Sequence, residues 1–142
     1  MLSLFDVNVL VALLDQNHGR HEIASNWFDT NSLDGWATCP ITQNGCIRLL
    51  SQPGYPNPLS VSEAIGNLRT AVSDDYHQFI LDDISILDGT RINSRGLSGH
   101  RQLTDVYLLA LPVTHDARLV TLDTHIPRIA VKGATEDHLV VI

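Results

Sequence analysis

The sequence contains no apolar run long enough to cross a membrane. A transmembrane helix needs about 18 or more consecutive apolar residues, and polar or charged residues interrupt every apolar segment of the 142-residue chain. The N-terminus also lacks the positively charged start and small-residue cleavage site of a secretory signal peptide. We therefore expect a protein without a membrane-spanning segment that works in the cytoplasm.

Cysteine is scarce, and neither cysteine has the spacing of a metal ligand. Cys39 and Cys46 belong to no Cys-x-x-Cys pair and no Cys/His zinc pattern. The seven histidines show no ligand spacing either, and His18 and His21, three residues apart, are expected to be solvated or to cap a helix. We expect both cysteines to be reduced, small residues of the core.

Basic residues are also few, and Lys132 is the only lysine beside eight arginines. The formal net charge of −7 argues against a protein that coats nucleic acid by bulk charge. Local binding of a phosphodiester remains open, because bound metal ions invert the local field. Arg91, Arg95 and Arg101 lie in a polar stretch just before Asp105. They belong either to a solvated loop or to a surface that contacts a substrate backbone.

Short apolar segments alternate with segments of helical periodicity. Strands are predicted at residues 2–5, 36–39, 76–81, 118–122 and 139–142. Helices are predicted at residues 8–14, 18–30, 42–50, 60–72 and 103–111, the last limited by Pro112. Loops are predicted at 51–58 and 82–101, with a helical turn near 84–87. This order predicts a single α/β domain over residues 1–142, in three layers. Its mainly parallel, twisted sheet has four to five strands, with helices on both faces.

Three aspartates occupy positions where ligands bind in such folds. Asp6 follows the first predicted strand, Asp123 follows the fourth, and Asp105 lies at the start of the last helix. Ligands bind at the carboxyl ends of strands in open α/β sheets, and a carboxylate buried there is costly unless something uses it. Converging carboxylates make a hard-oxygen site suited to Mg²⁺ or Mn²⁺. Alternatively, Asp6 and Asp105 are helix N-caps and Asp123 is a turn residue.

The chain resembles the PIN-domain family, and within it the VapC-type toxins of bacterial toxin–antitoxin pairs. The resemblance is carried, in order along essentially the whole chain, by residues 4–13, 37–48, 99–111 and 119–123. It implies a PIN-like fold and an endoribonuclease that hydrolyses RNA phosphodiester bonds with Mg²⁺ or Mn²⁺. It also implies a small VapB-like antitoxin as partner and assembly as a homodimer.

The same resemblance assigns roles to individual residues. Asp6, Asp105 and Asp123 would be the catalytic residues and would hold the metal. Asn8 and Thr121 would be accessory polar groups at the site.

One position departs from the family pattern. Many PIN domains carry a fourth acid on the helix after the second strand, but no Asp or Glu occurs between Asp34 and Glu63. Gln43 is the best match to that position, and an amide adds no charge. From this we expect weak Mg²⁺ binding, a preference for Mn²⁺, and tighter Mg²⁺ binding in Gln43→Glu. Alternatively, Gln43 caps its helix or faces solvent.

Two other functional classes remain as competitors. The missing acid would suit a non-catalytic PIN-like module that binds RNA or a protein. A phosphotransfer domain of similar build fits less well, because a phosphatase of that kind needs a second Asp where this chain has Asn8.

Overall fold

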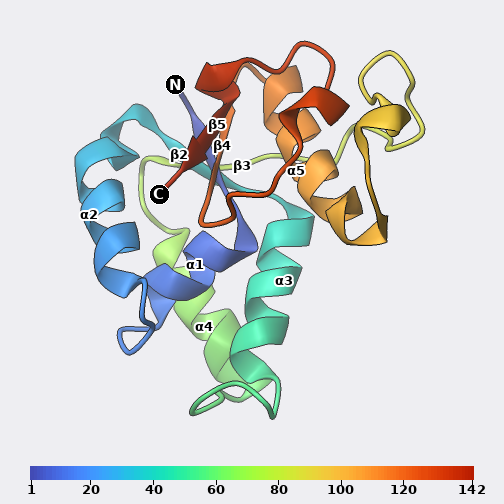
Figure 1. Cartoon of the computed structure of the whole chain (residues 1–142). Helices are drawn as coiled ribbons and strands as arrows, with labels where there is room; N and C mark the ends of the chain where they lie inside the picture. Colours follow the sequence, from blue (N-terminus) through green and yellow to red (C-terminus); the bar gives the residue numbers. More distant parts are fainter.

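Five short strands form one parallel sheet at the centre of the molecule (Figure 1). The computed structural model describes all 142 residues. The strands are β1 (Ser3–Phe5), β2 (Trp36–Thr38), β3 (His77–Phe79), β4 (Arg118–Thr121) and β5 (Leu139–Val141). Their order across the sheet is β3-β2-β1-β4-β5, and every neighbouring pair is parallel. All five predicted strands are confirmed.

Five α-helices connect or follow these strands. They are α1 (Val7–Leu14), α2 (His21–Asn31), α3 (Pro40–Ser51), α4 (Val61–Ala71) and α5 (Leu103–Thr114). Five 3₁₀ turns complete the fold: η1 (Ser32–Asp34), η2 (Ser94–Gly96), η3 (His100–Gln102), η4 (Arg128–Ala130) and η5 (Glu136–His138). The predicted capping box at the start of α4 is confirmed, since Ser60 and Glu63 exchange hydrogen bonds between side chain and backbone.

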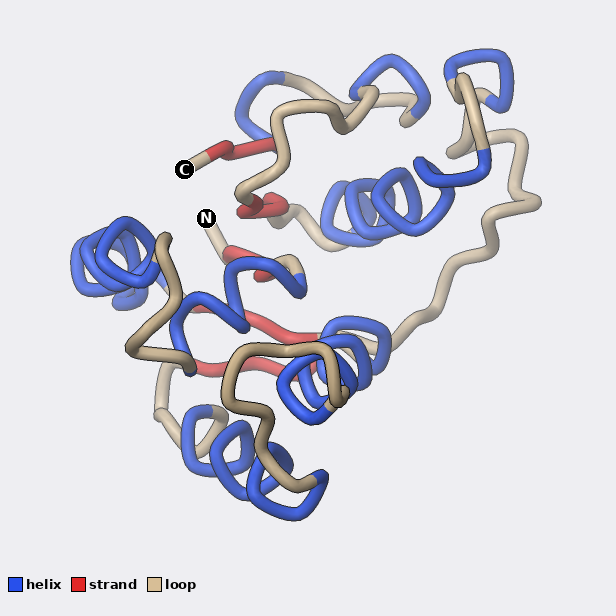
Figure 2. Tube along the Cα trace, turned by 60° about the horizontal axis from the view of Figure 1, so that its bottom comes forward, coloured by secondary structure: helices blue, strands red, loops and turns tan.

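The sheet separates two apolar cores, because successive residues of a strand point to opposite faces. Leu4 and Leu119 pack on one side with the buried face of α5. Phe5 and Val120 pack on the other side with residues of α1, α3 and α4, while α2 adds Trp27 and Phe28 at the margin. Figure 2 shows helices above and below the strands. The predicted three-layer α/β arrangement is confirmed.

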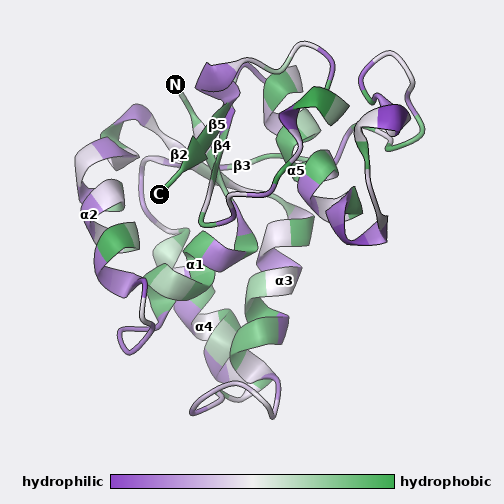
Figure 3. Cartoon of the chain, viewed as in Figure 1, coloured by the Kyte–Doolittle hydropathy of each residue, from purple (hydrophilic) through white to green (hydrophobic).

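Hydrophobic residues follow this layering. They concentrate on the strands and on the helix sides that face the sheet, whereas the outer loops are hydrophilic (Figure 3). Both cysteines are free and buried, as predicted. The longest helices, α3 and α5, have 12 residues each, and none of the helices has the length and apolarity to cross a membrane.

Two local predictions were wrong, and a third is confirmed only as a single turn. Helix α5 does not stop at Pro112 but runs two residues further to Thr114. A proline near the end of a helix removes few intrahelical bonds, and the buried apolar face of α5 outweighs that loss. Helix α2 begins at His21 because residues 18–20 form a turn, in which the backbone N–H of Arg20 donates to the ring of His18. Residues 84–87 form no helix but do form a single turn, in which the backbone N–H of Asp88 donates to the carbonyl of Ser85 at 3.1 Å.

Helices α1 and α3 approach each other closely at a glycine. A Cβ atom added to Gly45 would lie 2.6 Å from Cγ2 of Val7. We predict that Gly45→Ala lowers the free energy of unfolding by about 1–3 kcal/mol, because the overpacked contact forces the helices apart. Gly66→Ala in α4 is the control, since its Cβ would meet nothing within 4 Å. Its helix propensity should raise stability by about 0.5–1 kcal/mol. Urea unfolding of both variants tests this, and equal effects would contradict the close contact.

Candidate functional site

Asp6 is the most buried of the three predicted site acids. It directly follows β1 and caps α1, and its Oδ1 accepts a hydrogen bond from the backbone N–H of Val7 at 2.7 Å. Only 6% of the residue is exposed. The neighbouring strand β4 ends beside it, because Phe5 is paired with Val120 and the N–H of Asp6 donates to the carbonyl of Val120. The strand pairing therefore fixes Asp6 next to the end of β4.

A polar network joins this carboxylate to the chain after β4. The Thr121 hydroxyl donates to Asp6 Oδ2 at 2.6 Å, and Asn8 Nδ2 donates to the same oxygen at 3.1 Å. Asn8 Oδ1 accepts the backbone N–H of Leu122 at 3.0 Å, and Thr121 Oγ1 accepts that of Asp123 at 3.0 Å. The structure thus brings the two predicted accessory residues, Asn8 and Thr121, into direct contact with Asp6.

The other two acids are less constrained. Asp123 Oδ1 accepts the backbone N–H of His125 at 2.8 Å and lies 3.3 Å from its ring Nδ1. Asp105 is the third residue of α5, whose N-cap is Gln102, and the structure has no hydrogen bond to its carboxylate. The N-cap alternative therefore holds for Asp6 and not for Asp105.

The three carboxylates lie close enough together for their charges to affect pKa values within the group. Partial burial, reinforced by the charges of Asp6 and Asp123, raises the pKa of Asp105 to about 6. Burial also raises the pKa of Asp6, against the opposing hydrogen bonds from Thr121 and Val7, and the charge of Asp123 adds to the rise. No arginine or lysine forms an ion pair with any of the three. The cluster therefore carries unneutralised like charge.

This cluster fits a divalent cation by its chemistry. Carboxylate oxygens are the ligands that Mg²⁺ and Mn²⁺ prefer, and a cation would offset both the burial and the repulsion that raise these pKa values. No three Asp, Glu, His or Cys side chains are arranged to enclose an ion by themselves. Mg²⁺ usually keeps several waters and binds one or two carboxylates together with substrate phosphates. Asp6, Asp105 and Asp123 are the residues that would hold it.

Gln43 has a different partner from the one that the sequence suggested. Its Nε2 donates to Thr38 Oγ1 at 2.9 Å, and the Thr38 hydroxyl lies 2.9 Å from Nε2 of His77. The side chain also lines a hollow between α3 and α4. Gln43 therefore links α3 to β2 and, through Thr38, to β3. It neither caps its helix nor is fully solvated. No contact in the structure joins it to Asp6.

The three predicted RNA-contact arginines separate into two groups. Arg91 donates from Nη1 to Thr114 Oγ1 at 2.8 Å, and its Nε lies 3.2 Å from Asp88 Oδ2. These contacts hold it at the C-terminal end of α5, whereas Asp105 lies at the N-terminal end. Arg95 and Arg101 lie in η2 and η3 just before α5, are exposed and form no ion pair. Only these two remain available to a substrate.

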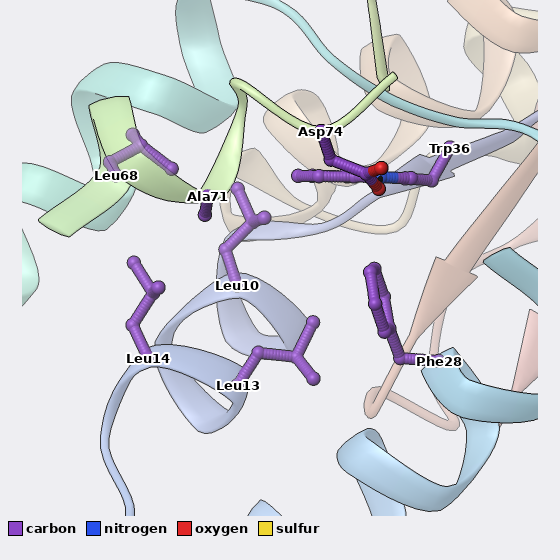
Figure 4. Close-up of a pocket in the computed structure, with 8 residues that line it drawn as sticks. All are labelled: Leu10, Leu13, Leu14, Phe28, Trp36, Leu68, Ala71 and Asp74. Carbon is purple, nitrogen blue, oxygen red and sulfur yellow. Dashed lines mark hydrogen bonds between the residues drawn. The ribbon is translucent and has the colours of Figure 1, made fainter. Parts of the chain in front are cut away.

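Sequence reasoning missed one feature and located another only in part, since helices 18–30 and 60–72 were expected to carry apolar residues that a small domain leaves uncovered. His125 lies two residues after Asp123 and bonds its carboxylate, and the only signal was the Asp-x-His spacing in a turn. The second feature is an apolar groove among α1, α2, α4 and β2, with a volume of about 380 Å³ (Figure 4). Its walls are formed by Leu10, Leu13, Leu14, Phe28, Trp36, Leu68, Ala71 and Asp74. None of the three site acids lines this groove, so it is a second candidate surface.

Comparison with known proteins agrees with these observations. The PIN domain family matches residues 3–132 of the chain. The chain is 50% identical over 139 residues to ribonuclease VapC44 of Mycobacterium tuberculosis, covering 98% of each protein. It is 37% identical over 137 residues to ribonuclease VapC39 of the same organism, covering 96% of this chain and 99% of the relative.

Among solved structures, the fold is similar to that of VapBC2 from Rickettsia felis, crystallised with a DNA fragment from the promoter of the pair. The TM-score is 0.67 at 13% sequence identity, and the match covers 100% of this chain and 98% of that one. At this identity the similarity supports the fold.

The raised pKa of Asp105 gives a testable dependence of stability on pH. Between pH 3.8 and about 6 the folded protein binds more protons at this carboxyl than the unfolded chain, so its contribution to stability falls as pH rises through that window. We predict that Asp105→Asn raises the free energy of unfolding by about 1 kcal/mol at pH 7.5, after discounting for solvent screening, and has little effect at pH 3.5.

Urea unfolding at the two pH values in the presence of EDTA measures this difference. Asp116→Asn is the matched control, because Asp116 is exposed and its positive φ of 51° suits asparagine. A gain for Asp105→Asn that is the same at both pH values would show that the carboxylate cluster is not its source.

Proposed function

The chain belongs to the PIN-domain family, and we propose that it is a metal-dependent endoribonuclease of the VapC type. It hydrolyses RNA phosphodiester bonds and is the toxin of a toxin–antitoxin pair. The observation that supports this proposal is that Asp6 and Asp123 lie close enough to Asp105 for their charges to add to the burial that raises its pKa, and that the charge of Asp123 also adds to the raised pKa of Asp6. The ribonuclease names of VapC44 and VapC39 support the choice of RNA as substrate.

The chemistry follows from the arrangement of the chain's own residues. Asp6 is held in one orientation by three hydrogen bonds, from Val7, Asn8 and Thr121, so its carboxylate is preorganised. Asp105 and Asp123 supply further oxygens from α5 and from the turn after β4. Asp6, Asp105 and Asp123 would hold a divalent cation, which would supply the Lewis-acid chemistry needed to activate water and to stabilise charge on the phosphoryl oxygens.

Substrate positioning falls to a small number of basic groups. Arg95 and Arg101 are exposed, free of ion pairs and located just before the helix that carries Asp105. We assign to them contacts with the RNA backbone, which fix register without reading sequence. Arg91 has no such role in this proposal, because Asp88 and Thr114 hold its guanidinium.

Two protein partners belong to the same proposal. A small VapB-like antitoxin would neutralise the toxin, and its segment would lie along the apolar groove between α1, α2 and α4, since helical segments bind such grooves through their apolar face.

A homodimer is the expected assembly. Light scattering at a concentration on the order of tens of micromolar tests it, and a monomer would count against it. The cytoplasm is the proposed compartment, where both RNA and antitoxin are present.

Replacing the site acids tests the activity directly. We predict that Asp6→Asn, Asp105→Asn and Asp123→Asn each lower RNA cleavage by about 100-fold or more, because each removes a charged metal ligand. Both oxygens of Asp6 accept hydrogen bonds, so thermal unfolding is measured for Asp6→Asn, whereas Asp105→Asn removes the charge without breaking a hydrogen bond. Asp116→Asn is the control and should cleave at the wild-type rate. EDTA should stop the wild-type reaction, and added Mg²⁺ or Mn²⁺ should restore it.

The same assay separates the alternative function. A non-catalytic PIN-like module is the competing possibility, motivated by the absence of a fourth acid between Asp34 and Glu63. Metal-independent RNA binding without cleavage in the wild-type protein would favour that module. Full cleavage by Asp6→Asn would exclude the proposed role of the acid cluster.

The contact of Gln43 reverses the sequence-based expectation for its acidic variant. Because Nε2 of Gln43 is bound to Thr38, we predict that Gln43→Glu leaves Mg²⁺ affinity within about twofold of wild type. It should instead lose about 1 kcal/mol of stability with the hydrogen bond. Calorimetric titration of Mg²⁺ and urea unfolding measure the two quantities, with Gln78→Glu on exposed β3 as control. A marked tightening of Mg²⁺ binding would show that residue 43 turns toward the acids.

A further inference from the structure

The apolar groove contains a single charged group. Seven of its eight lining residues are hydrophobic, and the eighth is Asp74, in the turn between α4 and β3. Figure 4 shows Asp74 beside the indole ring of Trp36, with the leucines of α1 on the opposite side of the hollow. A carboxylate at the rim of an apolar surface gives that surface a preferred sign of charge in its partner.

The charge of Asp74 is not compensated within the chain. Its oxygens accept hydrogen bonds from Trp36 Nε1 at 2.7 Å and from the backbone N–H of Tyr76 at 3.3 Å, both neutral donors. None of the four ion pairs in the structure includes it. The ring of His77 packs on Trp36 and forms no ion pair with Asp74; burial lowers the pKa of His77, and the charge of Asp74 opposes that shift. Asp74 is therefore fixed in place with its charge available.

We propose that Asp74 is a specificity-determining residue that selects an arginine or lysine in the segment occupying this groove. The occupant is an amphipathic helix of the antitoxin, so the inference rests on the proposed toxin function. Its apolar face contacts Leu10, Leu14 and Leu68, and one basic side chain lies against Asp74. The aliphatic stem of that side chain covers the rings of Trp36 and Phe28 while its cationic head reaches the carboxylate.

Two other occupants fit these observations less well. RNA bases could stack on Trp36 and Phe28, but the groove contains no arginine or lysine, and Asp74 would repel the phosphates. A second copy of this chain could dimerise through another face, but in this groove it would bring an acidic surface, from a chain with a net charge of −7, to the carboxylate of Asp74. A basic helical segment meets neither obstacle.

The test uses the full chain and the product of the reading frame adjoining its gene, co-expressed and then separated. Affinity is measured by calorimetry for the wild type, Asp74→Asn and Asp74→Lys. We expect Asp74→Asn to weaken binding about tenfold and Asp74→Lys about 100-fold or more, within the range measured for close charge pairs across interfaces. Asp75→Asn is the matched control, because Asp75 is the adjacent acid, is exposed and does not line the groove. It should stay within about twofold of wild type.

A charge-swap experiment identifies the partner group. Each arginine or lysine of the adjoining product is changed to glutamate, and the variant that loses affinity for wild-type toxin should regain it with Asp74→Lys, as coupled positions do in a double-mutant cycle. Asn in place of Asp74 still accepts the Trp36 bond, and thermal unfolding checks that the fold is retained.

The outcomes separate this inference from the function on which it rests. If the wild-type chain cleaves RNA and binds the adjoining product, but Asp74→Asn and Asp75→Asn behave alike, the selectivity of Asp74 is wrong and the toxin function stands. If the wild-type chain does not bind that product, both fail. An altered affinity for RNA, or an altered oligomeric state in Asp74→Asn alone, would assign the groove to RNA or to a second copy and overturn the proposal.

Discussion

The Asp6 carboxylate is the junction on which the candidate site depends. Its oxygens accept hydrogen bonds from Val7, Asn8 and Thr121, which belong to the first turn of α1 and to the end of β4. Thr121 is separated from Asp6 by 115 positions in the chain. A buried carboxylate with fewer partners would be strongly destabilising. The same bonds that make its burial tolerable also hold two neighbouring strand ends and a helix start in one fixed arrangement.

Because Asp6 already fixes the position of the strand ends, the other two acids, Asp105 and Asp123, can be less constrained. Asp105 has no hydrogen-bond partner, and the bonds to Asp123 come from the exposed turn that carries His125. Burial, together with the charges of Asp6 and Asp123, raises the pKa of Asp105, so the ionised carboxylate is held there at a cost that a bound cation would offset. Asp6 is therefore held in one orientation, whereas the carboxylates of Asp105 and Asp123 can adjust their positions. Such a division suits a site whose coordination is completed by waters and by the phosphate of a substrate.

The sequence was sufficient for the architecture because its local signals agree with the tertiary packing. Apolar segments separated by capping residues such as Ser60 predicted strands and helices in an order that requires a parallel sheet. The parallel sheet in turn predicted that Asp6 and Asp123 would lie at the same edge. The hydrogen-bond partners of long polar side chains could not be predicted from the sequence. Arg91 bonds Thr114 and Gln43 bonds Thr38, and these choices depend on which elements pack together rather than on residue type or spacing. The extension of α5 past Pro112 has the same origin in tertiary burial.

The net negative charge of the chain is compatible with an enzyme that acts on RNA, because of where the carboxylates lie in the structure. The two candidate surfaces, the edge at Asp6 and the groove at Asp74, both present carboxylates that form no ion pair with an arginine or lysine of the chain. Each therefore favours a cation, a divalent metal in the first case and a basic side chain in the second. RNA is attracted only where a metal and the few free arginines reverse the local sign. The net charge of −7 thus restricts non-specific RNA binding, and it would favour the basic antitoxin segment proposed above. Affinity between toxin and antitoxin should accordingly fall with ionic strength, because part of it is a long-range attraction between opposite charges.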